Sequence, residues 1–154
     1  MVVVQEHQTA ACVLLMQQSR LPFLKELCLV QGLGIDLVAV SRFAQWLDRY
    51  DRETLGLVFT SEEIERCQAV SQQDLFYAIC FATKEAVGKA LKTGLVGIQW
   101  TEIDAILTDH QLEIQLQGNA QNYAVHKGID HWQAVWVAWN NHVLVQVIGF
   151  VGNR

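Results

Sequence analysis

The spacing of hydrophobic residues predicts a strand and then a helix in the first third of the chain. The apolar run from Leu27 to Ile35 is interrupted by Gly32 and Gly34, which indicates a strand whose backbone something approaches closely, with Asp36 at its end. Apolar residues then recur at the spacing of an amphipathic helix: Phe43, Trp46, Leu47 and Tyr50. Ser41, just before this stripe, is predicted to cap the helix N-terminus.

The remaining pattern predicts two more helices, a strand pair, a short helix and a hairpin. Thr60-Ser61-Glu62-Glu63 has the form of a capping box, so a short helix is expected to begin there. The other predicted elements are a helix over 73–91 that ends before Gly94, strands over 100–107 and 112–117 joined by a turn at Asp109-His110, a helix over 120–127 that ends at Gly128, and a hairpin of 131–139 and 143–151 around Asn140-Asn141. The predicted order is β-α-α-α-β-β-α-β-β, an α+β fold with an antiparallel sheet packed against helices.

Length and composition predict a single domain over 25–154, preceded by an extension over 1–24 in which Pro22 is a plausible boundary marker. The net charge of −5 gives no support for a nucleic-acid partner, because backbone binding depends on clustered Lys and Arg. The hydrophobic share of 51%, the mean hydropathy of +0.17 and five tryptophans suggest apolar surface buried against another subunit. The lack of an apolar run of about 20 residues and of a good signal peptide predicts a cytoplasmic protein with no membrane partner.

Neither cysteine nor histidine spacing predicts a metal or redox site. The four cysteines are far apart and form no C-x-x-C pair, so we expect buried free thiols: Cys12, Cys28, Cys67 and Cys80. The five histidines form no H-E-x-x-H motif, which favours ordinary surface or packed histidines. Trp132, Trp136 and Trp139 are expected to pack in a core or between subunits.

The candidate chemistry lies in the run Phe81–Ala90, taken together with Asp36. Glu85 and Lys89 are four residues apart and share one face of the predicted helix, whereas Lys84 is turned about 100° away. Mg²⁺ usually takes one or two protein carboxylates and fills its shell with water and substrate phosphates, so Asp36 and Glu85 could hold Mg²⁺ on a pyrophosphate. An ordinary surface ion pair between Glu85 and Lys89, and a capping role for Asp36, are the structural alternatives.

Five segments of the chain resemble the holo-[acyl-carrier-protein] synthases, the small single-domain type of 4′-phosphopantetheinyl transferase. They are Gly34-Ile35-Asp36-Leu37-Val38; Phe59-Thr60-Ser61-Glu62-Glu63; Phe81 to Leu91 with Thr93-Gly94; Trp100 with Ile103; and Gly118, Ala120, Gly128, Ile129 and Trp132. The resemblance covers about residues 28 to 132. Their order and spacing match the family, which implies its fold.

The resemblance also implies an activity and a set of site residues. A serine hydroxyl of apo-acyl carrier protein would attack the β-phosphorus of coenzyme A, and 3′,5′-ADP would leave. Asp36 and Glu85 match the family's Mg²⁺ carboxylates, and Lys89 matches the lysine that reaches the phosphates of coenzyme A. Lys84 completes the family's Lys-Glu pair.

The resemblance further implies partner contacts and an assembly. Arg42, Arg49 and Arg52 match arginines that meet the acidic recognition helix of the carrier protein, although a solvated helix face is the plainer interpretation of them. The family forms a trimer, with coenzyme A held in clefts between neighbouring subunits.

Two departures from the family pattern support an alternative function. Cys80 stands where the family usually has an arginine, and Val135-Trp136-Val137-Ala138-Trp139 replaces a Ser-x-Ser-His segment. These changes are consistent with a catalytically weakened relative that acts as a carrier-protein or coenzyme A binding module. A third hypothesis is an unrelated Mg²⁺-dependent enzyme that acts on another nucleotide pyrophosphate.

Overall fold

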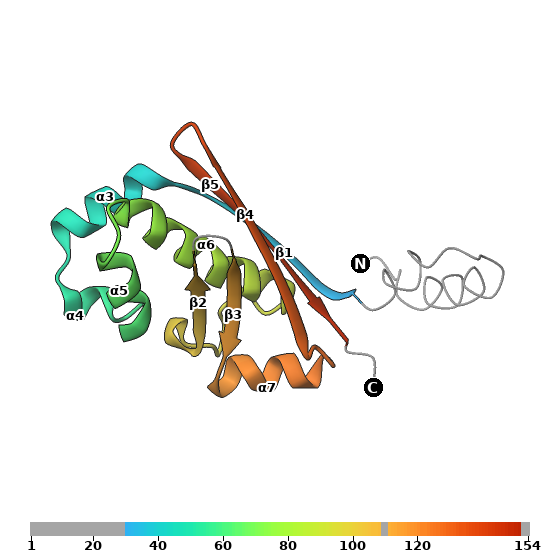
Figure 1. Cartoon of the computed structure of the whole chain (residues 1–154). Coiled ribbons are helices and arrows are strands. Elements are labelled where there is room, and N and C mark those ends of the chain that lie inside the picture. The colour runs from blue at the N-terminus through green and yellow to red at the C-terminus, as the bar shows by residue number, and fades with distance from the viewer. Residues whose placement is uncertain (1–29, 109–110, 152–154) are drawn as a thin grey trace. The chain divides into compact units, whose positions relative to one another are not determined.

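The computed structural model describes residues 30–108 and 111–151, which form an α+β arrangement of two small sheets and several helices (Figure 1). The elements, in chain order, are β1 (Val30–Ala39), α3 (Val40–Arg49), α4 (Arg52–Leu55), α5 (Ser61–Gln68), α6 (Gln73–Ala90), the 3-10 turn η1 (Trp100–Glu102), β2 (Ile103–Leu107), β3 (Leu112–Leu116), α7 (Gly118–His126), β4 (His131–Trp139) and β5 (His142–Phe150). The predicted extension over 1–24, the Asp109-His110 turn, Cys12 and Cys28 lie outside the described residues.

Every predicted element between β1 and β5 is present, with three local differences. Strand β1 continues to Ala39, so Asp36 lies inside the strand rather than at its end. The N-cap of α3 is Ala39 and has no side-chain cap; the Ser41 hydroxyl instead accepts a 2.8 Å hydrogen bond from the Asn141 amide. The short helix α4 was not predicted, and the first residues of the expected strand over 100–107 form η1 instead.

The strands form a three-stranded sheet in the order β1-β5-β4 and a two-stranded sheet of β2 and β3. Strands β4 and β5 pair antiparallel, with Cα partners running from His131↔Phe150 to Trp139↔His142. Asn140 and Asn141 have φ angles of 44° and 62°, which confirms the predicted two-residue hairpin turn.

Helix α6 is the centre of the core and contacts both sheets as well as α3 and α5. Most of its eighteen residues are buried, including Tyr77, Ile79 and Val87. A helix that is apolar on nearly all sides needs partners on all of them, and α6 finds these partners in β2, β5, α3 and α5. The residues of α6 are thereby held in fixed positions between the two sheets and the helices α3 and α5.

The three-stranded sheet has one face toward helix α6, and its opposite face is apolar and exposed. Side chains alternate along each strand, so Val143, Val145 and Val147 of β5 point into the core. Residues on the opposite face of β1 and β4 are between 45% and 54% exposed: Leu33, Ile35, Leu37, Val135, Val137 and Trp139. None of the helices that the structure describes combines the length and hydropathy needed to cross a membrane.

Candidate functional site

Two glycines place β1 directly against helix α6. A Cβ atom at Gly32 would lie 2.5 Å from the carbonyl oxygen of Ala90, and one at Gly34 would collide with the carbonyl oxygen of Ala86. Only glycine permits this approach of two backbones, which confirms the close contact predicted from the glycines. Because side chains alternate along a strand, Asp36 projects toward the same helix as Gly34.

The contact brings Asp36 to Lys89. The Lys89 ammonium donates to the Asp36 carboxylate over 2.7 Å and to the carbonyl oxygen of Ile35 over 2.9 Å. The Asp36 side chain is 13% exposed and that of Lys89 is 48% exposed, so the pair lies at the surface with the lysine outermost. An ion pair with a half-exposed lysine exchanges partners at small cost, because exposed pairs contribute little net free energy.

Glu85 lies one helical turn before Lys89, and the charge of Asp36 affects its pKa. Burial, and then the negative charge of Asp36, raise the pKa of the Glu85 carboxyl above its ordinary value; the positive charges of Lys89 and Arg42 act in the opposite direction. The carboxyl groups of Asp36 and Glu85, from distant parts of the chain, are therefore close enough for the charge of one to affect the pKa of the other.

The donor set fits Mg²⁺ bound together with a phosphate. Mg²⁺ takes oxygen ligands and commonly only one or two protein carboxylates, which is what Asp36 and Glu85 offer. Residues 30–108 and 111–151 contain no group of three or more His, Cys, Asp and Glu side chains that could hold a metal alone. A cleft of about 640 Å³ lies between β3 and β4, and neither carboxylate lines it.

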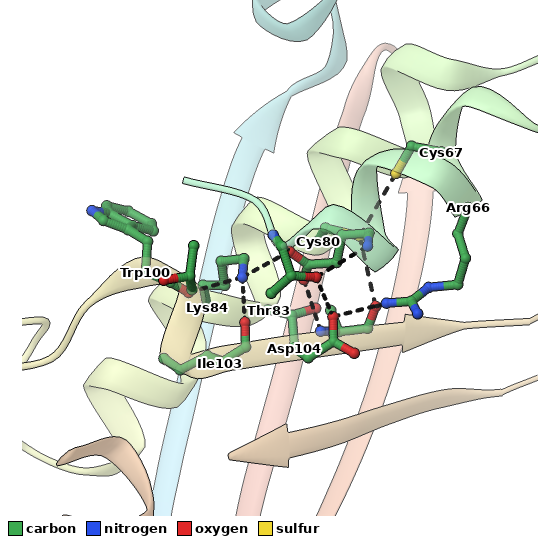
Figure 2. Close-up of polar contacts among 12 residues, drawn as sticks. Arg66, Cys67, Cys80, Thr83, Lys84, Trp100, Ile103 and Asp104 are labelled. Carbon is green, nitrogen blue, oxygen red and sulfur yellow. Dashed lines mark hydrogen bonds and ion pairs between the residues drawn. The ribbon is translucent and has the colours of Figure 1, made fainter. Parts of the chain in front are cut away.

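Lys84 lies in the interior of the protein, whereas Lys89 of the same helix lies at the surface. Its side chain is fully buried, and its ammonium donates to the carbonyl oxygens of Trp100 (2.9 Å) and Ile103 and to a carboxylate oxygen of Glu63 (2.8 Å), as Figure 2 shows for the two carbonyls. All three N–H bonds of the ammonium are used inside the protein. In this arrangement Lys84 has no donor left for the phosphates of coenzyme A.

Glu63 is the buried partner of Lys84, a role that the sequence pattern did not predict. It is fully buried and accepts hydrogen bonds from the backbone N–H groups of Thr60 and Ala105, each at 2.8 Å, in addition to Lys84. Burial raises the pKa of the Glu63 carboxyl, whereas the charge of Lys84 and these hydrogen bonds lower it. The capping box at Thr60–Glu63 is confirmed, but it indicated only the local bond and not the ion pair to α6.

Cys80 lies in the interior next to Cys67. The two sulfur atoms are 4.0 Å apart, and both thiols are free and buried, as predicted. The contact with Cys67, and then burial, raise the pKa of the Cys80 thiol well above its ordinary value, so it remains a neutral thiol near pH 7. Cys80 is 2% exposed and is not in a position to meet a ligand at the surface.

The three predicted partner arginines are all exposed but differ in their surroundings. The guanidinium of Arg42 lies over the rings of Trp46 and Phe81, and that of Arg49 lies over Tyr50. Arg52 forms an exposed pair with Glu65 at 3.4 Å. These arginines belong to α3 and α4, next to the end of β1 that carries Asp36.

Comparison with known proteins establishes the family. Residues 32–146 match the 4′-phosphopantetheinyl transferase superfamily, and the chain belongs to this superfamily. It is 35% identical over 79 residues to the holo-[acyl-carrier-protein] synthase of Geobacter sp. (strain M21), a match that covers 51% of this chain and 63% of the relative. It is 45% identical over 78 residues to that of Treponema denticola, covering 49% and 60% respectively. The matched region thus spans about three fifths of the length of these two relatives.

Other comparisons extend the match over more of the chain. The holo-[acyl-carrier-protein] synthase of Hydrogenovibrio crunogenus is 32% identical over 106 residues, which cover 68% of this chain and 84% of the relative. The crystal structure of the synthase from Neisseria meningitidis has a TM-score of 0.69 at 22% identity, covering 78% of this chain and 98% of that chain. The structure of the Helicobacter pylori synthase in complex with coenzyme A has a TM-score of 0.63 at 23% identity, with coverages of 76% and 98%. These structures confirm the predicted fold.

Proposed function

We propose that this protein transfers 4′-phosphopantetheine from coenzyme A to a serine hydroxyl of an apo-acyl carrier protein and releases 3′,5′-ADP in a Mg²⁺-dependent reaction. The observation that carries the proposal is the convergence of Asp36, Glu85 and Lys89 at the contact between β1 and α6. The relatives named above are holo-[acyl-carrier-protein] synthases, and one structure of the same fold holds coenzyme A. A carrier protein of fatty-acid synthesis is the substrate that we propose, and a cytoplasmic location stays a prediction.

The charge of each residue determines its proposed role: the acids bind the metal and Lys89 binds phosphate. Asp36 and Glu85 would hold Mg²⁺, which when bound polarises the pyrophosphate and offsets charge on the leaving diphosphate. Lys89 is half exposed and can exchange the Asp36 carboxylate for a phosphate oxygen, with which an ammonium forms a charge-assisted hydrogen bond. In place of the predicted phosphate contact, we propose that Lys84 supports α6 and η1 from inside the protein.

The exposed arginines provide a docking surface for an acidic partner. Arg42 and Arg49 belong to α3, which follows β1 directly, and Arg52 begins α4. A carrier protein bound at these arginines would present its serine to Asp36 and Glu85. The net charge of the chain is −5, so attraction of an acidic carrier would depend on this local patch rather than on the protein as a whole.

A homotrimer would explain the exposed apolar face of the three-stranded sheet. This face carries six large apolar side chains that are about half exposed. Single exposed apolar residues are common on protein surfaces, but a contiguous group of this kind is typical of an interface. A neighbouring subunit would bury these side chains. Sedimentation velocity tests the assembly: Val137→Asp should convert a trimer to monomers, whereas a wild-type protein that sediments as a monomer at micromolar concentration would contradict it.

Mass spectrometry of carrier proteins tests the activity. Apo-acyl carrier proteins are incubated with the protein, coenzyme A and Mg²⁺, and each carrier is weighed. We expect the mass of one phosphopantetheine group to be added by the wild type and by the control Glu62→Gln, an exposed acid on α5. Glu85→Gln should lose the transfer. No mass gain on any carrier would refute the proposal.

The second candidate function is a binding module without turnover. Its support is the pair of departures noted above: Cys80 is sealed in the interior, and β4 offers neither a hydroxyl nor an imidazole over Val135–Trp139. His142 begins β5 and holds the backbone of the turn through a 2.9 Å contact of its Nδ1 with the Asn140 oxygen. This candidate predicts binding of carrier or coenzyme A with no transfer, which the same assay combined with calorimetry distinguishes.

A further inference from the structure

Arg42 is held against aromatic rings in a way that the other exposed arginines are not. Its guanidinium carbon lies 4.8 Å from the ring centre of Trp46, 5.0 Å from that of Phe81 and 5.9 Å from that of Phe43. Trp46 is one helical turn after Arg42 on α3, while Phe81 belongs to α6. The contact therefore joins the two helices across their interface, and such cation–π contacts are attractive at these distances.

The rings beneath Arg42 are themselves fixed by packing. Phe81 stacks on Trp100 with ring centres 5.0 Å apart and an interplanar angle of 25°, and its edge-on contact with Trp46 has a centroid distance of 5.7 Å. Phe43 and Phe81 are buried, and Trp46 is half-buried. An arginine seated on fixed rings has already lost much of its side-chain freedom, so less is lost when it binds an anion.

The other two arginines lack this arrangement. Arg49 has a single ring contact, 5.8 Å from the centre of Tyr50, which is itself exposed. Arg52 is engaged by Glu65 and by the Gln68 side chain at 3.3 Å, so its charge is partly neutralised within the protein. Only Arg42 among the three lies close enough to Glu85 to lower the pKa of that carboxyl.

We propose that Trp46 and Phe81 are positioning residues that hold the Arg42 guanidinium beside the Asp36–Glu85 pair, where it is the principal arginine for an acidic side chain of the carrier protein. The inference rests on the proposed function, since it assigns an unequal share of carrier binding to the docking surface. A planar guanidinium lying on a ring still has its N–H edge free, so it can bind a carboxylate with two parallel hydrogen bonds. A carboxylate held there would fix the distance between the carrier's serine and the acid pair.

Variants of Trp46 test the inference by separating carrier binding from coenzyme A binding. The probe is the apo-acyl carrier protein of Treponema denticola, titrated calorimetrically against wild type, Trp46→Leu, Trp46→Phe and Arg42→Lys. Tyr50→Leu is the matched control, because it removes a ring from under Arg49 and not from under Arg42. Titration with coenzyme A and steady-state transfer kinetics are measured in parallel, and thermal unfolding establishes that each variant is folded.

Trp46→Leu and Arg42→Lys should weaken carrier binding and raise the KM for carrier by about three- to tenfold, the loss expected from one cation–π contact of moderate strength. The KM for coenzyme A should stay within about twofold, and Trp46→Phe should recover most of the carrier affinity. Tyr50→Leu should have a smaller effect than Trp46→Leu.

Three results would overturn the inference. They are unchanged carrier affinity in Trp46→Leu and Arg42→Lys, an equal loss for Tyr50→Leu, and a loss of coenzyme A affinity that matches the loss for carrier. Transfer by the wild type together with any of these would refute the inference and leave the proposed function standing. Carrier binding that Trp46→Leu weakens, without transfer by the wild type, would support the inference and refute the proposed function. No binding of the carrier by the wild type would refute both.

Discussion

Replacement of Lys84 by Met should destabilise the protein severely without a direct effect on coenzyme A binding. The substitution keeps an unbranched side chain, one atom shorter, but removes an ammonium that is fully buried and that bonds Glu63, Trp100 and Ile103. Two carbonyl oxygens would lose a partner, and the Glu63 carboxylate would lose its counter-charge. Breaking a buried ion pair by removing one partner typically costs about 3–5 kcal/mol, because the remaining charge is left without compensation.

This loss is a large part of the free energy of unfolding of a typical domain, about 5–15 kcal/mol. Urea unfolding at fixed protein concentration measures it: with an m-value of about 2 kcal/mol/M, the midpoint should fall by roughly 1.5–2.5 M. Lys92→Met is the control, because Lys92 is an exposed lysine in the turn just after the same helix. Adding Glu63→Gln to Lys84→Met should recover part of the loss, since the unpaired charge is then absent.

The pH dependence of the loss gives a sharper test. Burial already raises the pKa of Glu63 above its ordinary value of 4.5, and without Lys84 the folded-state pKa should rise further. An acid with a raised folded-state pKa carries no penalty below its unfolded-state pKa; the penalty grows as the pH rises from the unfolded-state pKa to the folded-state pKa and is constant above it. The difference between wild type and Lys84→Met should therefore be smaller near pH 5 than near pH 8. A pH-independent difference below about 1 kcal/mol, or a KM for coenzyme A raised tenfold in folded Lys84→Met, would refute the reasoning.

Three further predictions follow from other contacts. Gly34→Ala should cost more than the 1–3 kcal/mol typical of overpacking, about 3 kcal/mol or more in urea unfolding, because the added Cβ meets the backbone carbonyl of Ala86; an unchanged midpoint would contradict the contact. Thr60→Ala should cost about 1–2 kcal/mol in the same assay through loss of the helix cap and of the 2.8 Å bond to Asp104, whereas Thr60→Ser should retain most of the stability. Because the pKa of Glu85 is raised and Mg²⁺ binds the ionised form, calorimetric Mg²⁺ affinity should fall as the pH is lowered toward that pKa, at a pH above the 4.5 of an ordinary glutamate, and Arg42→Ala should move the fall to still higher pH. An affinity that is flat down to about pH 4.5 would contradict the last prediction.

The sequence pattern was sufficient for the elements with clear periodicity and turn chemistry. The hairpin followed from the tolerance of Asn140 and Asn141 for positive φ. Gly32 and Gly34 predicted a close approach to β1, but not that α6 makes it. Helix α4 has four residues and one cap, in which Asp51 accepts from the Thr54 N–H, so it has too few turns to show a period. The extent of β1 depended on a partner distant in sequence, since the backbone N–H of Val40 bonds the Asn141 oxygen at 2.8 Å.

At the candidate site, the relative placement of residues on one helix could be predicted from their spacing, whereas contacts between different elements could not. Glu85 and Lys89 were correctly placed on one face because their separation of four residues fixes it. Lysine is usually a surface residue, and nothing in the segment around Lys84 predicts its ion pair with Glu63, 21 positions earlier. A buried lysine requires such a partner, and only the tertiary structure supplies one.

The central claim is that Asp36 and Glu85 bind one divalent ion together, and a binding cycle with Mn²⁺ in place of Mg²⁺ tests it most directly. Free Mn²⁺ is measured by electron paramagnetic resonance in the presence of coenzyme A for wild type, Asp36→Asn, Glu85→Gln and the double variant. We predict one ion per chain for the wild type, a loss of at least about tenfold in affinity for each single variant, and a double variant little worse than either, because residues that act as a unit are not additive. Losses that simply add, or wild-type affinity retained by either single variant, would contradict the account.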